Sequence, residues 1–462
     1  MSLTFTPKLA VARVTGALSR RSGRGGGTTL PGRVLLRLAP DAITRLSSGL
    51  PGGTTVVSAT NGKTTTAGMI ASALRAAGRV PVHNRAGSNM SWGVATALLE
   101  QRGEEGLFEV DEAWLPRIAR EVGPTLIVLG NLFRDQLDRY GELERLADEW
   151  GRLVAERAGR TTFALNADDP LVADAGRDPK LQRRQGIVYF GIEDRGVALS
   201  ELQHAHDAKH CRRCGAAYAY DAAFVGHLGH YRCPSCGAAR PRPDVAATRI
   251  ELRGMDGSQV EVATPDGTVE LSLSLPGLYN VYNALAALAA SRELGIDTAE
   301  AAAGVAATHA AFGRVETIDV GGVAVSILLI KNPAGANEVL RTLRLESERE
   351  EGAERLDLWI ALNDRIADGR DVSWVWDADF ELLAAVSSRV VCAGTRAAEM
   401  AVRLKYAGVD PERIAVRERI DESLDLAVAG APGRVFALPT YTALIELRRL
   451  LSRRGLAAEF WR

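Results

Sequence analysis

The chain has 462 residues, 46% of them hydrophobic, and its 56 Lys and Arg residues nearly balance its 57 Asp and Glu residues. This length predicts about three domains, and a net charge near zero excludes general affinity for nucleic acid. No apolar run approaches the roughly 20 residues that cross a bilayer, and no N-terminal apolar core fits a signal peptide. We therefore expect an ordinary globular protein with no transmembrane segment and no nucleic-acid partner.

Residues 1–46 are strongly basic. They hold one acidic residue, Asp41, against eight basic residues: Lys8, Arg13, Arg20, Arg21, Arg24, Arg33, Arg37 and Arg45. Such an arm is suited to contact an anionic membrane surface or a pyrophosphate group. The alternative is a solvated, partly disordered leader. We favour the leader, because a basic arm alone is weak evidence of a partner.

A short β-branched run, a polar turn and a predicted helix follow one another in Val56–Ala71. Backbone N–H groups of such a turn and of the helix N-terminus bind anions. We expect Lys63, exposed at the turn, to contact the terminal phosphates of a nucleotide, and Thr64 to hold Mg²⁺. The match to the general phosphate-binding loop is partial, since its first glycine would fall on Val57. The alternative is a helix start capped by a threonine hydroxyl.

Short apolar runs alternate with helical patterns between residues 54 and 195. The expected strands are Thr54–Ala59, Leu107–Val110, Leu126–Leu129, Thr161–Leu165 and Ile187–Phe190. This alternation predicts a parallel sheet with helices on both faces, and ligands bind at the carboxyl ends of such strands. Three groups fall at those ends: the acids of Phe108–Glu112, then Asn131, and then Asn166–Pro170. A carboxylate of the first group can complete a magnesium shell. The alternative for each group is a turn.

Four of the five cysteines form two C-x-x-C pairs, Cys211 with Cys214 and Cys233 with Cys236, which 18 residues separate. This spacing is typical of a structural Zn²⁺ site, and four thiolates leave no open position for catalysis. The alternatives are coincidence or two disulfides, but such pairs in a large chain indicate a reducing cytoplasm. The histidines of this region are expected on the polar surface of the insert: His204, His206, His210, His227 and His230.

The α/β alternation resumes beyond residue 316. The expected strands are Leu356–Ala361, Arg389–Ala393, Arg413–Val416 and Arg434–Leu438, and the expected helices include Thr395–Ala407 and Tyr441–Ser452. A loop over residues 363–377 carries several acids, a glycine, Trp374 and Trp376. On composition it fits an interface or site and a loop pinned by two core tryptophans equally well.

The order of these motifs resembles the Mur ligase family. The matching segments are Thr60–Thr65, with Ala59 in place of a glycine of the family loop G-T-N-G-K-T-T; Val110–Ala113, its second magnesium motif; Asn166–Pro170, its N-x-D-D-P; Pro276–Ala284, its G-x-x-N-x-x-N-A; and Phe312–Glu316, its G-R-x-E linker. The resemblance implies Mg²⁺ at Thr64 and Glu112 and adenine at Asn280 and Asn283. It implies ATP binding by Thr60, Asn61, Gly62, Lys63, Thr64, Thr65, Asn280, Asn283 and Arg314.

Departures from the family indicate its MurT branch. About 50 residues precede the loop, too few for the UDP-binding domain of other members. Val188–Gly196 contains no lysine that could be carbamylated, and the family's D-Y-A-H-N-P appears as Leu329–Pro333. The cysteine insert is similar to that of MurT proteins. The segment Ala367–Asp377 resembles their C-terminal signature A-D-G-x-D-x-S-W-x-W-D.

The resemblance implies ATP-dependent amidation of the D-glutamate α-carboxylate of the lipid II stem peptide to D-isoglutamine, through an acyl phosphate. Ammonia would come from a GatD-type glutaminase, in a heterodimer or larger complex. Asp371, or in the alternative Asp368, is implied to serve the glutaminase as its missing acid. The implied cofactors are ATP, Mg²⁺ and structural Zn²⁺, and the implied place is the cytoplasm, at the inner face of the membrane.

The predicted fold is α/β, with a Mur ligase-type central P-loop ATPase domain, a four-cysteine zinc-ribbon insertion and a C-terminal Rossmann-like domain. The expected boundaries are 1–50 for the basic segment, 51–315 for the central domain with its insertion at 200–245, and 316–462 for the C-terminal domain. Two rival hypotheses stay open. One is a Mur or folylpolyglutamate-type ligase that joins an amino acid without a glutaminase; the other is a zinc-containing nucleotide-binding scaffold without catalytic activity.

Overall fold

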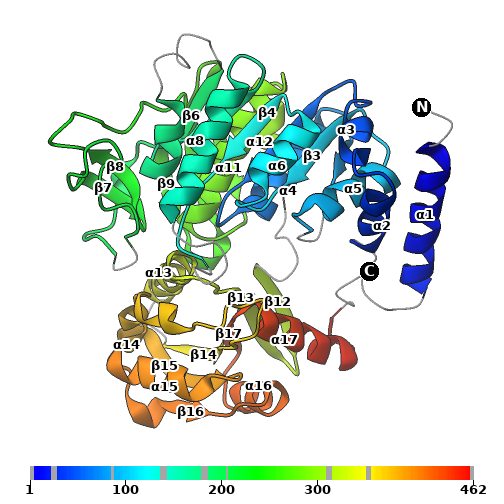
Figure 1. Ribbon diagram of the computed structural model, residues 1–462. Helices are drawn as coiled ribbons and strands as arrows, with labels where there is room; N and C mark the ends of the chain where they lie inside the picture. Colours follow the sequence, from blue (N-terminus) through cyan, green and yellow to red (C-terminus); the bar gives the residue numbers. More distant parts are fainter. Residues whose placement is uncertain are drawn as a thin grey trace.

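The computed structural model describes residues 5–21, 29–84, 88–135, 143–177, 186–203, 206–308, 315–349 and 355–457. Two separate sheets, each flanked by helices, lie one above the other in Figure 1. This arrangement confirms the α/β class. In the part of the chain that the structure describes, no helix combines the length and apolarity needed to cross a membrane.

The upper sheet has the strand order β11-β10-β9-β6-β5-β4-β1-β3-β2. Its strands are β1 Thr54–Ser58, β2 Pro81–His83, β3 Glu105–Glu109, β4 Leu126–Leu129, β5 Thr162–Asn166, β6 Ile187–Ile192, β9 Val245–Leu252, β10 Ser258–Thr264 and β11 Gly267–Leu273. Neighbours from β2 to β9 are parallel, and β9, β10 and β11 are antiparallel. The predicted parallel strands are therefore confirmed, and an antiparallel extension joins them.

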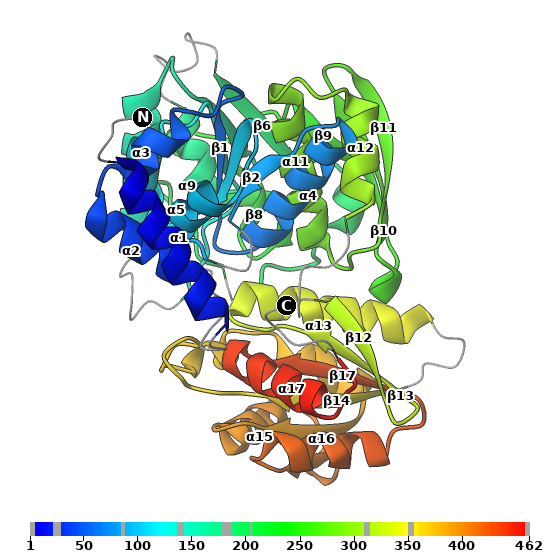
Figure 2. The ribbon, with the colours of Figure 1, turned by 90° about the vertical axis from the view of Figure 1, so that its right-hand side faces the viewer.

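Helices cover both faces of this sheet (Figures 1 and 2). One face packs against α4 Lys63–Ala76, α11 Leu278–Glu293 and α12 Thr298–Ala306; the other packs against α3 Ala42–Ser47, α5 Ser91–Glu100, α6 Leu115–Val122, α8 Leu143–Arg157 and α9 Pro170–Ala173. Successive strand residues alternate between the two cores: Val57 and Val128 face α4, whereas Val56 and Ile127 face α6. Because both faces are buried, the central strand β4 is a continuous apolar run, and the polar residues of β1 and β3 lie at the strand ends.

The prediction of a disordered leader is wrong for the N-terminal residues that the structure describes. Helices α1 Phe5–Arg21 and α2 Leu30–Leu38 pack against α5. Phe5 and Leu9 are buried in a cluster with Leu35 and Leu99, and the Arg13 guanidinium donates to the Leu99 carbonyl at 3.0 and 3.1 Å. The apolar residues recur every three or four positions, a helical period that the high charge obscured.

The lower sheet has the order β12-β13-β17-β14-β15-β16, parallel except between β12 and β13. Its strands are β12 Val315–Val320, β13 Val323–Leu328, β14 Leu356–Ala361, β15 Ser387–Ala393, β16 Ile414–Val416 and β17 Arg434–Pro439. Its helices are α13 Pro333–Arg349, α14 Leu383–Val386, α15 Ala397–Tyr406, α16 Ile420–Ala429 and α17 Tyr441–Arg453, with 3-10 turns η4 Ser373–Trp376, η5 Phe380–Leu382 and η6 Pro411–Arg413. The four predicted strands and both predicted helices are confirmed; the β12–β13 hairpin was not predicted.

Helix α13 lies between the two sheets (Figure 2). Its Arg341 donates to the carbonyls of Val197, at 2.6 Å, and Phe224, at 3.2 Å. Phe224 belongs to a small hairpin, β7 Ala219–Val225 with β8 Leu228–Arg232, on the far side of the central sheet from α1 (Figure 1). Three 3-10 turns complete the upper half: η1 Asp174–Gly176, η2 Arg195–Val197 and η3 Gly254–Asp256.

Candidate nucleotide site, cysteine cluster and acidic loop

The turn between β1 and α4 requires a glycine at position 62. Gly62 adopts φ +91°, and a Cβ there would lie 2.0 Å from the Asn283 side-chain oxygen. Both the left-handed backbone and the close approach exclude other residues. The helix that follows directs its N-terminal N–H groups into the turn, the arrangement that binds phosphate.

Lys63 is buried, so the prediction that it is exposed at the turn is wrong. Its ammonium lies 2.7 Å from a Glu112 carboxylate oxygen and also contacts the Ala59 carbonyl. Burial opposes the charged form, but Glu112, Asp111 and Glu109 raise the pKa of Lys63 above its ordinary value. Burial likewise works against ionised Glu112, yet Lys63 and Lys331 lower its pKa. Both groups therefore stay charged near neutral pH.

A second acid, Glu109, lies beside the first turn of α4. The Thr64 hydroxyl donates to a Glu109 carboxylate oxygen at 3.0 Å, and Asn84 holds the Glu109 backbone through hydrogen bonds of 2.8 Å on each side. Glu109 belongs to the acidic segment Phe108–Glu112 that the sequence singled out, but only Glu112 was assigned to Mg²⁺. The strand that Glu109 ends, β3 Glu105–Glu109, carries a glutamate at each end.

Two asparagines hold the turn from opposite sides. The Asn131 side chain accepts from the Asn61 N–H and donates to the Asn61 carbonyl, both at 2.9 Å. From the lower half, the Asn332 amide exchanges two hydrogen bonds with the Asn61 amide, at 3.0 and 3.2 Å. The Lys331 ammonium donates to the Thr60 carbonyl at 3.1 Å and to Asp135 at 2.6 Å. Lys63, at the start of α4, and Lys331, between β13 and α13, thus bring two positive charges to one turn.

Asn280 and Asn283 lie at the start of α11, behind the turn. The Thr66 hydroxyl donates to the Asn283 oxygen at 3.2 Å, and the Asn283 amide donates to Asn280 at 3.0 Å. Both side chains are buried, and they brace the turn through α4. Thr65 is also buried, in the first turn of α4. Arg314 lies outside the described residues.

The acids of Asn166–Pro170 form a structural network. Asp168 and Asp169 are fully buried. Asp168 accepts from the Tyr282 hydroxyl at 2.7 Å, the Ile192 N–H at 2.8 Å and Arg240. Asp169 accepts from the Leu132 and Leu171 N–H groups, both at 2.8 Å. These aspartates join β5, α11 and the insertion, and they do not reach the turn at Gly62.

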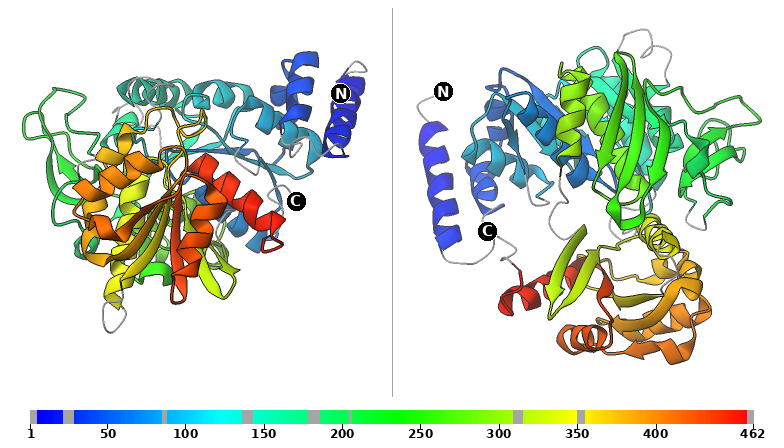
Figure 3. Two further views of the ribbon diagram at one scale, coloured as in Figure 1. Left: turned by 90° about the horizontal axis from the view of Figure 1, so that it is seen from below. Right: turned by 180° about the vertical axis from the view of Figure 1, so that it is seen from behind.

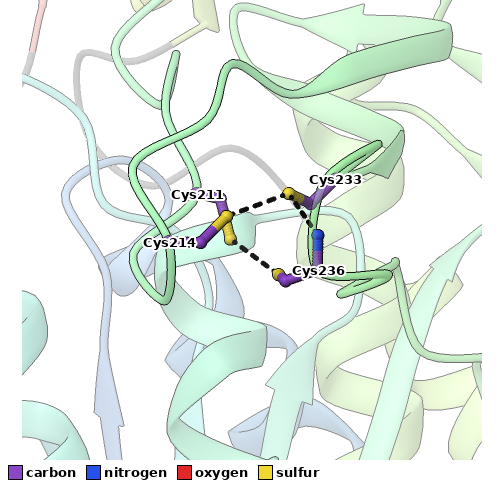
Figure 4. A group of neighbouring side chains, drawn as sticks. All are labelled: Cys211, Cys214, Cys233 and Cys236. Atoms are coloured by element: carbon purple, nitrogen blue, oxygen red, sulfur yellow. Dashed lines mark hydrogen bonds between the residues drawn. The ribbon is translucent and has the colours of Figure 1, made fainter.

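The four cysteine sulfurs converge in one cluster (Figure 4), all within 4.8 Å of one another. The Cys211 and Cys236 sulfurs are 3.6 Å apart, and those of Cys214 and Cys233 are 3.4 Å apart. Four thiolates around one Zn²⁺, each at about 2.3 Å, would be separated by about 3.8 Å. The donor set and spacing therefore fit a tetrahedral zinc ion.

The two halves of the cluster repeat one local structure. After each C-x-x-C, a glycine with positive φ, Gly215 at +77° and Gly237 at +74°, reverses the chain. Its N–H donates to the carbonyl of the first cysteine, at 2.8 Å to Cys211 and at 3.1 Å to Cys233. Glycine suits this position because it adopts positive φ without a steric penalty.

The histidines of the insert do not form a polar surface, except for the exposed His210. His206, His227 and His230 are buried, and His204 lies outside the described residues. The His227 ring packs on Phe133, with centroids 4.7 Å apart, and its Nε2 is 3.3 Å from Asp169. The prediction failed because the hairpin tip turns inward onto the central domain, where aromatic neighbours and a buried acid take up the imidazole.

The loop over residues 363–377, which contains η4, holds its acids in different ways. Asp368 is buried and accepts from the Thr442 N–H at 2.7 Å and from the Thr442 hydroxyl, so it fixes the first turn of α17. Asp364 accepts from Arg396 at 2.8 Å, and Asp377 lies 3.3 Å from Arg134. Asp371 is exposed and accepts from the Ser373 N–H at 2.8 Å.

An aromatic surface lies beside Asp371. Trp376 is 52% exposed and packs on the 73% exposed Tyr406, with ring centroids 5.9 Å apart. Arg403 is buried beneath, 5.4 Å from the centre of the Trp376 ring, and donates to the Val375 carbonyl at 2.9 Å. Trp374 is half-buried against the core of the lower sheet. One tryptophan therefore pins the loop and the other is presented outward.

Two regions of the chain match known protein families. Residues 57–291 match the Mur ligase middle domain family, and residues 329–444 match the MurT ligase C-terminal family. The chain is 33% identical, over 99% of its own length and 99% of the other, to the MurT subunit of the glutamine-hydrolyzing lipid II isoglutaminyl synthase of Streptococcus pneumoniae. It is 31% identical to the MurT subunit of the same enzyme of Staphylococcus aureus, over 96% of this chain and 97% of that one.

Solved structures with the same fold are more distant in sequence. A pseudomurein peptide ligase type C from Methanothermus fervidus aligns with a TM-score of 0.67 at 22% identity, covering 89% of this chain and 80% of that one. MurF from Acinetobacter baumannii aligns with a TM-score of 0.62 at 17% identity, covering 90% of this chain and 80% of that one. The fold is that of the Mur ligases, and the near full-length matches show that the chain belongs to the MurT family.

Proposed function

We propose that the chain is the ligase subunit that amidates the D-glutamate α-carboxylate of the lipid II stem peptide, forming D-isoglutamine in peptidoglycan synthesis. The near full-length identity to MurT subunits of lipid II isoglutaminyl synthase supports this activity. The same identity disfavours the rival hypothesis of a ligase that adds an amino acid. Because the relatives are named as subunits of a synthase, it also disfavours a scaffold without catalytic activity.

The reaction needs activation of a carboxylate, which is a poor electrophile. Transfer of the γ-phosphoryl group of ATP gives an acyl phosphate, and ammonia displaces the phosphate. The turn around Gly62 supplies backbone N–H groups for the phosphates, and Lys63 and Lys331 supply positive charge for the transferred group. No covalent intermediate on this chain is required.

The proposed ATP-binding residues remain Thr60, Asn61, Gly62, Lys63, Thr64, Thr65, Asn280, Asn283 and Arg314, to which Lys331 is added. For Asn280 and Asn283 we propose a bracing role, since they contact the turn through Thr66 and Gly62. Mur ligases use ATP with Mg²⁺, and Thr64, Glu109 and Glu112 are oxygen donors of the kind that Mg²⁺ prefers. When bound, Mg²⁺ would neutralise charge on the phosphates.

We further propose one structural Zn²⁺ at Cys211, Cys214, Cys233 and Cys236. The sulfur spacing and the paired glycine turns support it. A site with four thiolate ligands is closed to substrate, so its contribution is to folding. The insertion at 200–245 is accordingly a zinc ribbon within a central domain at 51–315. Residues 1–50 precede that domain, and a Rossmann-like C-terminal domain spans 316–462.

Ammonia is proposed to come from a GatD-type glutaminase bound at the C-terminal domain. The glutaminase needs a cysteine nucleophile and a histidine whose second nitrogen is held by an acid. Asp371 is the best candidate for that acid, because its side chain is exposed and its hydrogen bonds are to its near neighbour Ser373. Asp368 is buried and engaged by Thr442, which disfavours the alternative. The proposed place of action is the cytoplasmic face of the membrane, where ATP and lipid II meet.

The proposed function is tested with the purified chain, ATP, Mg²⁺, lipid II and ammonium chloride. We expect ADP, phosphate and a product in which one carboxyl hydroxyl is replaced by an amino group, with no other amino acid incorporated. Adding the glutaminase should allow glutamine to replace ammonium. Incorporation of an amino acid in place of ammonia, or no substrate-dependent ADP, would contradict the proposal.

A further inference from the structure

Helix α1 has a second apolar face that nothing in the described chain covers. Its inner face holds Phe5, Leu9 and Ala12, which are buried against α2 and α5. Residues 11, 14 and 18 recur at helical spacing on the opposite side. Val11 is 53%, Val14 59% and Leu18 61% exposed.

Arg21, the last residue of the helix, falls on the outer side by the same spacing, but from residue 6 to residue 18 the outer face carries no charge. Its exposed positions, taken at 100° per residue, are Thr6, Pro7, Ala10, Val11, Val14, Ala17 and Leu18. On the same helical projection Lys8 and Arg13 flank this strip on its two sides, and the whole helix contains no acidic residue. A surface helix normally turns charged residues to water, so a contiguous apolar strip indicates a binding surface.

The fold presents this strip at the edge of the molecule. Helix α1 is the outermost element on its side in Figures 1 and 3, beyond α2 and α5. It is fixed to the body by its buried residues and by the hydrogen bonds from Arg13 to the Leu99 carbonyl. The strip is therefore held on a stable platform and points away from the protein.

We propose that the outer face of α1 docks on the anionic surface of the membrane, an inference that rests on the proposed function, whose substrate is a membrane lipid. The charge of the segment favours an anionic membrane as the partner, because residues 1–46 carry eight basic residues and one acidic residue, Asp41. An apolar strip between basic flanks is the pattern of a helix that lies in the interface of an anionic bilayer. Val11, Val14 and Leu18 enter the acyl boundary, and Lys8 contacts lipid phosphates, whereas the Arg13 guanidinium stays on the Leu99 carbonyl.

Docking through α1 serves a substrate that cannot leave the bilayer. The lipid II stem peptide extends from the membrane surface, so an enzyme held on that surface meets it by diffusion in two dimensions. The helix lies on the bilayer and does not cross it, in accord with its 17 residues and its packed inner face.

The experiment is co-sedimentation of the full chain with vesicles that contain no substrate. Vesicles of phosphatidylglycerol and phosphatidylethanolamine are compared with vesicles of phosphatidylcholine. We expect binding to the anionic vesicles and little to the neutral ones, with affinity falling as salt rises. The double variant Val14→Asp, Leu18→Asp should lose about tenfold or more of the affinity, and Lys8→Gln about fivefold.

The matched control is Val80→Asp, a 64% exposed valine elsewhere in the central domain, which should bind like the wild type. Circular dichroism and thermal unfolding confirm that each variant is folded. The double variant should amidate a water-soluble stem peptide at the wild-type rate but lipid II in vesicles more slowly. Equal vesicle binding by wild type and double variant overturns the proposal, as does absence of wild-type binding.

Two other outcomes also overturn it. If the double variant changes the oligomeric state in light scattering, a second copy of the chain covers α1. If it loses the glutaminase subunit in size-exclusion chromatography, that partner does. Because the vesicles hold no lipid II, failure of membrane docking is distinguishable from failure of the proposed amidation.

Discussion

The charge pair Lys63–Glu112 combines a catalytic and a structural role. Lys63→Met removes the cation that the proposed phosphoryl transfer uses, and we expect amidation to fall by about 10²–10³-fold. It also leaves Glu112 buried without its partner, at 11% side-chain exposure, which should cost about 3–5 kcal/mol of stability.

The double variant Lys63→Met, Glu112→Gln separates the two effects. It should regain most of the lost unfolding free energy, because no buried charge is left unpaired, while ATP-dependent amidation stays low. Thermal unfolding and an ADP-release assay make the comparison. Wild-type turnover in the folded double variant would refute the assignment of Lys63 to the phosphate site.

The buried imidazoles His206 and His227 should respond oppositely to pH. Burial lowers the pKa of His206 from 6.5 to about 4, and the nearby His227 is the second largest cause of this shift. Burial opposes charging of His227, but Asp169 raises its pKa above 6.5. Because the folded state keeps His206 neutral, the protein loses stability as pH falls from 6.5 toward 4. The His227–Asp169 pair acts the other way. Its stabilising effect is complete below pH 6.5 and is lost as pH rises through the pKa of His227 in the folded state.

This opposition is measured as the melting temperature of His206→Gln and His227→Gln between pH 5 and 8. Relative to wild type, His206→Gln should gain stability as the solution is acidified. His227→Gln should be most destabilised at the acid end. The neighbouring titratable groups Asp207 and Tyr220 are present in both variants, so their own titration does not account for a difference between the two. The same pH trend in both variants would contradict the assignment.

At the scale of elements, much of the fold was predictable because both faces of the central strands are buried. The strand Leu126–Leu129 is then an apolar run between turn residues, and its limits follow from the sequence alone. The strand predicted at Leu107–Val110 instead spans Glu105–Glu109, and the short strand β2 was not predicted. The β10 and β11 strands escaped prediction because one side is exposed and polar residues interrupt the pattern. Helix α1 was not predicted, because its many basic residues obscure the helical spacing of its apolar residues.

The site was predictable where one residue type carries the chemistry. The four cysteines could be predicted because their spacing is that of a zinc site. Gly62 could be predicted because the positive φ of the turn requires glycine. Lys331 and Glu109 join the site through tertiary contacts, at 3.1 Å to Thr60 and 3.0 Å to Thr64. No local pattern encodes those contacts. Likewise, only the structure separates exposed Asp371 from buried Asp368.

The proposed zinc ribbon should behave as a structural element. Cys211→Ser is expected to lose the metal and to lower the melting temperature, while the folded fraction retains most of its turnover, because the site contributes folding energy. Elemental analysis should give one zinc per wild-type chain. Cys392→Ser is the control, since Cys392 lies in the core of the lower sheet, outside the cluster. Wild-type protein without zinc and with four titratable cluster thiols would contradict the prediction.

At the scale of the whole molecule, the C-terminal domain reaches the nucleotide turn through Lys331 and Asn332. Lys331→Met should raise the KM for ATP by about tenfold, because a charge-assisted contact contributes about 1.5–3 kcal/mol. The control is Lys405→Met, at an exposed position on α15, which should leave the KM unchanged. An unaltered KM in Lys331→Met would place the lysine outside the nucleotide site.

In the function that we propose, the chain carries two separate sites, an ATP site at the turn around Gly62 and an acid presented to a glutaminase partner. The most direct test of this claim is amidation of lipid II by the complex of Asp371→Asn with the glutaminase, measured in parallel with glutamine and with ammonium as nitrogen donor. We predict that complex formation persists and that glutamine-dependent amidation falls by about 10⁴-fold, while the ammonium-dependent rate is unchanged and Asp364→Asn behaves like wild type. Equal loss with both donors would contradict the account, because Asp371 would then belong to the ligase site.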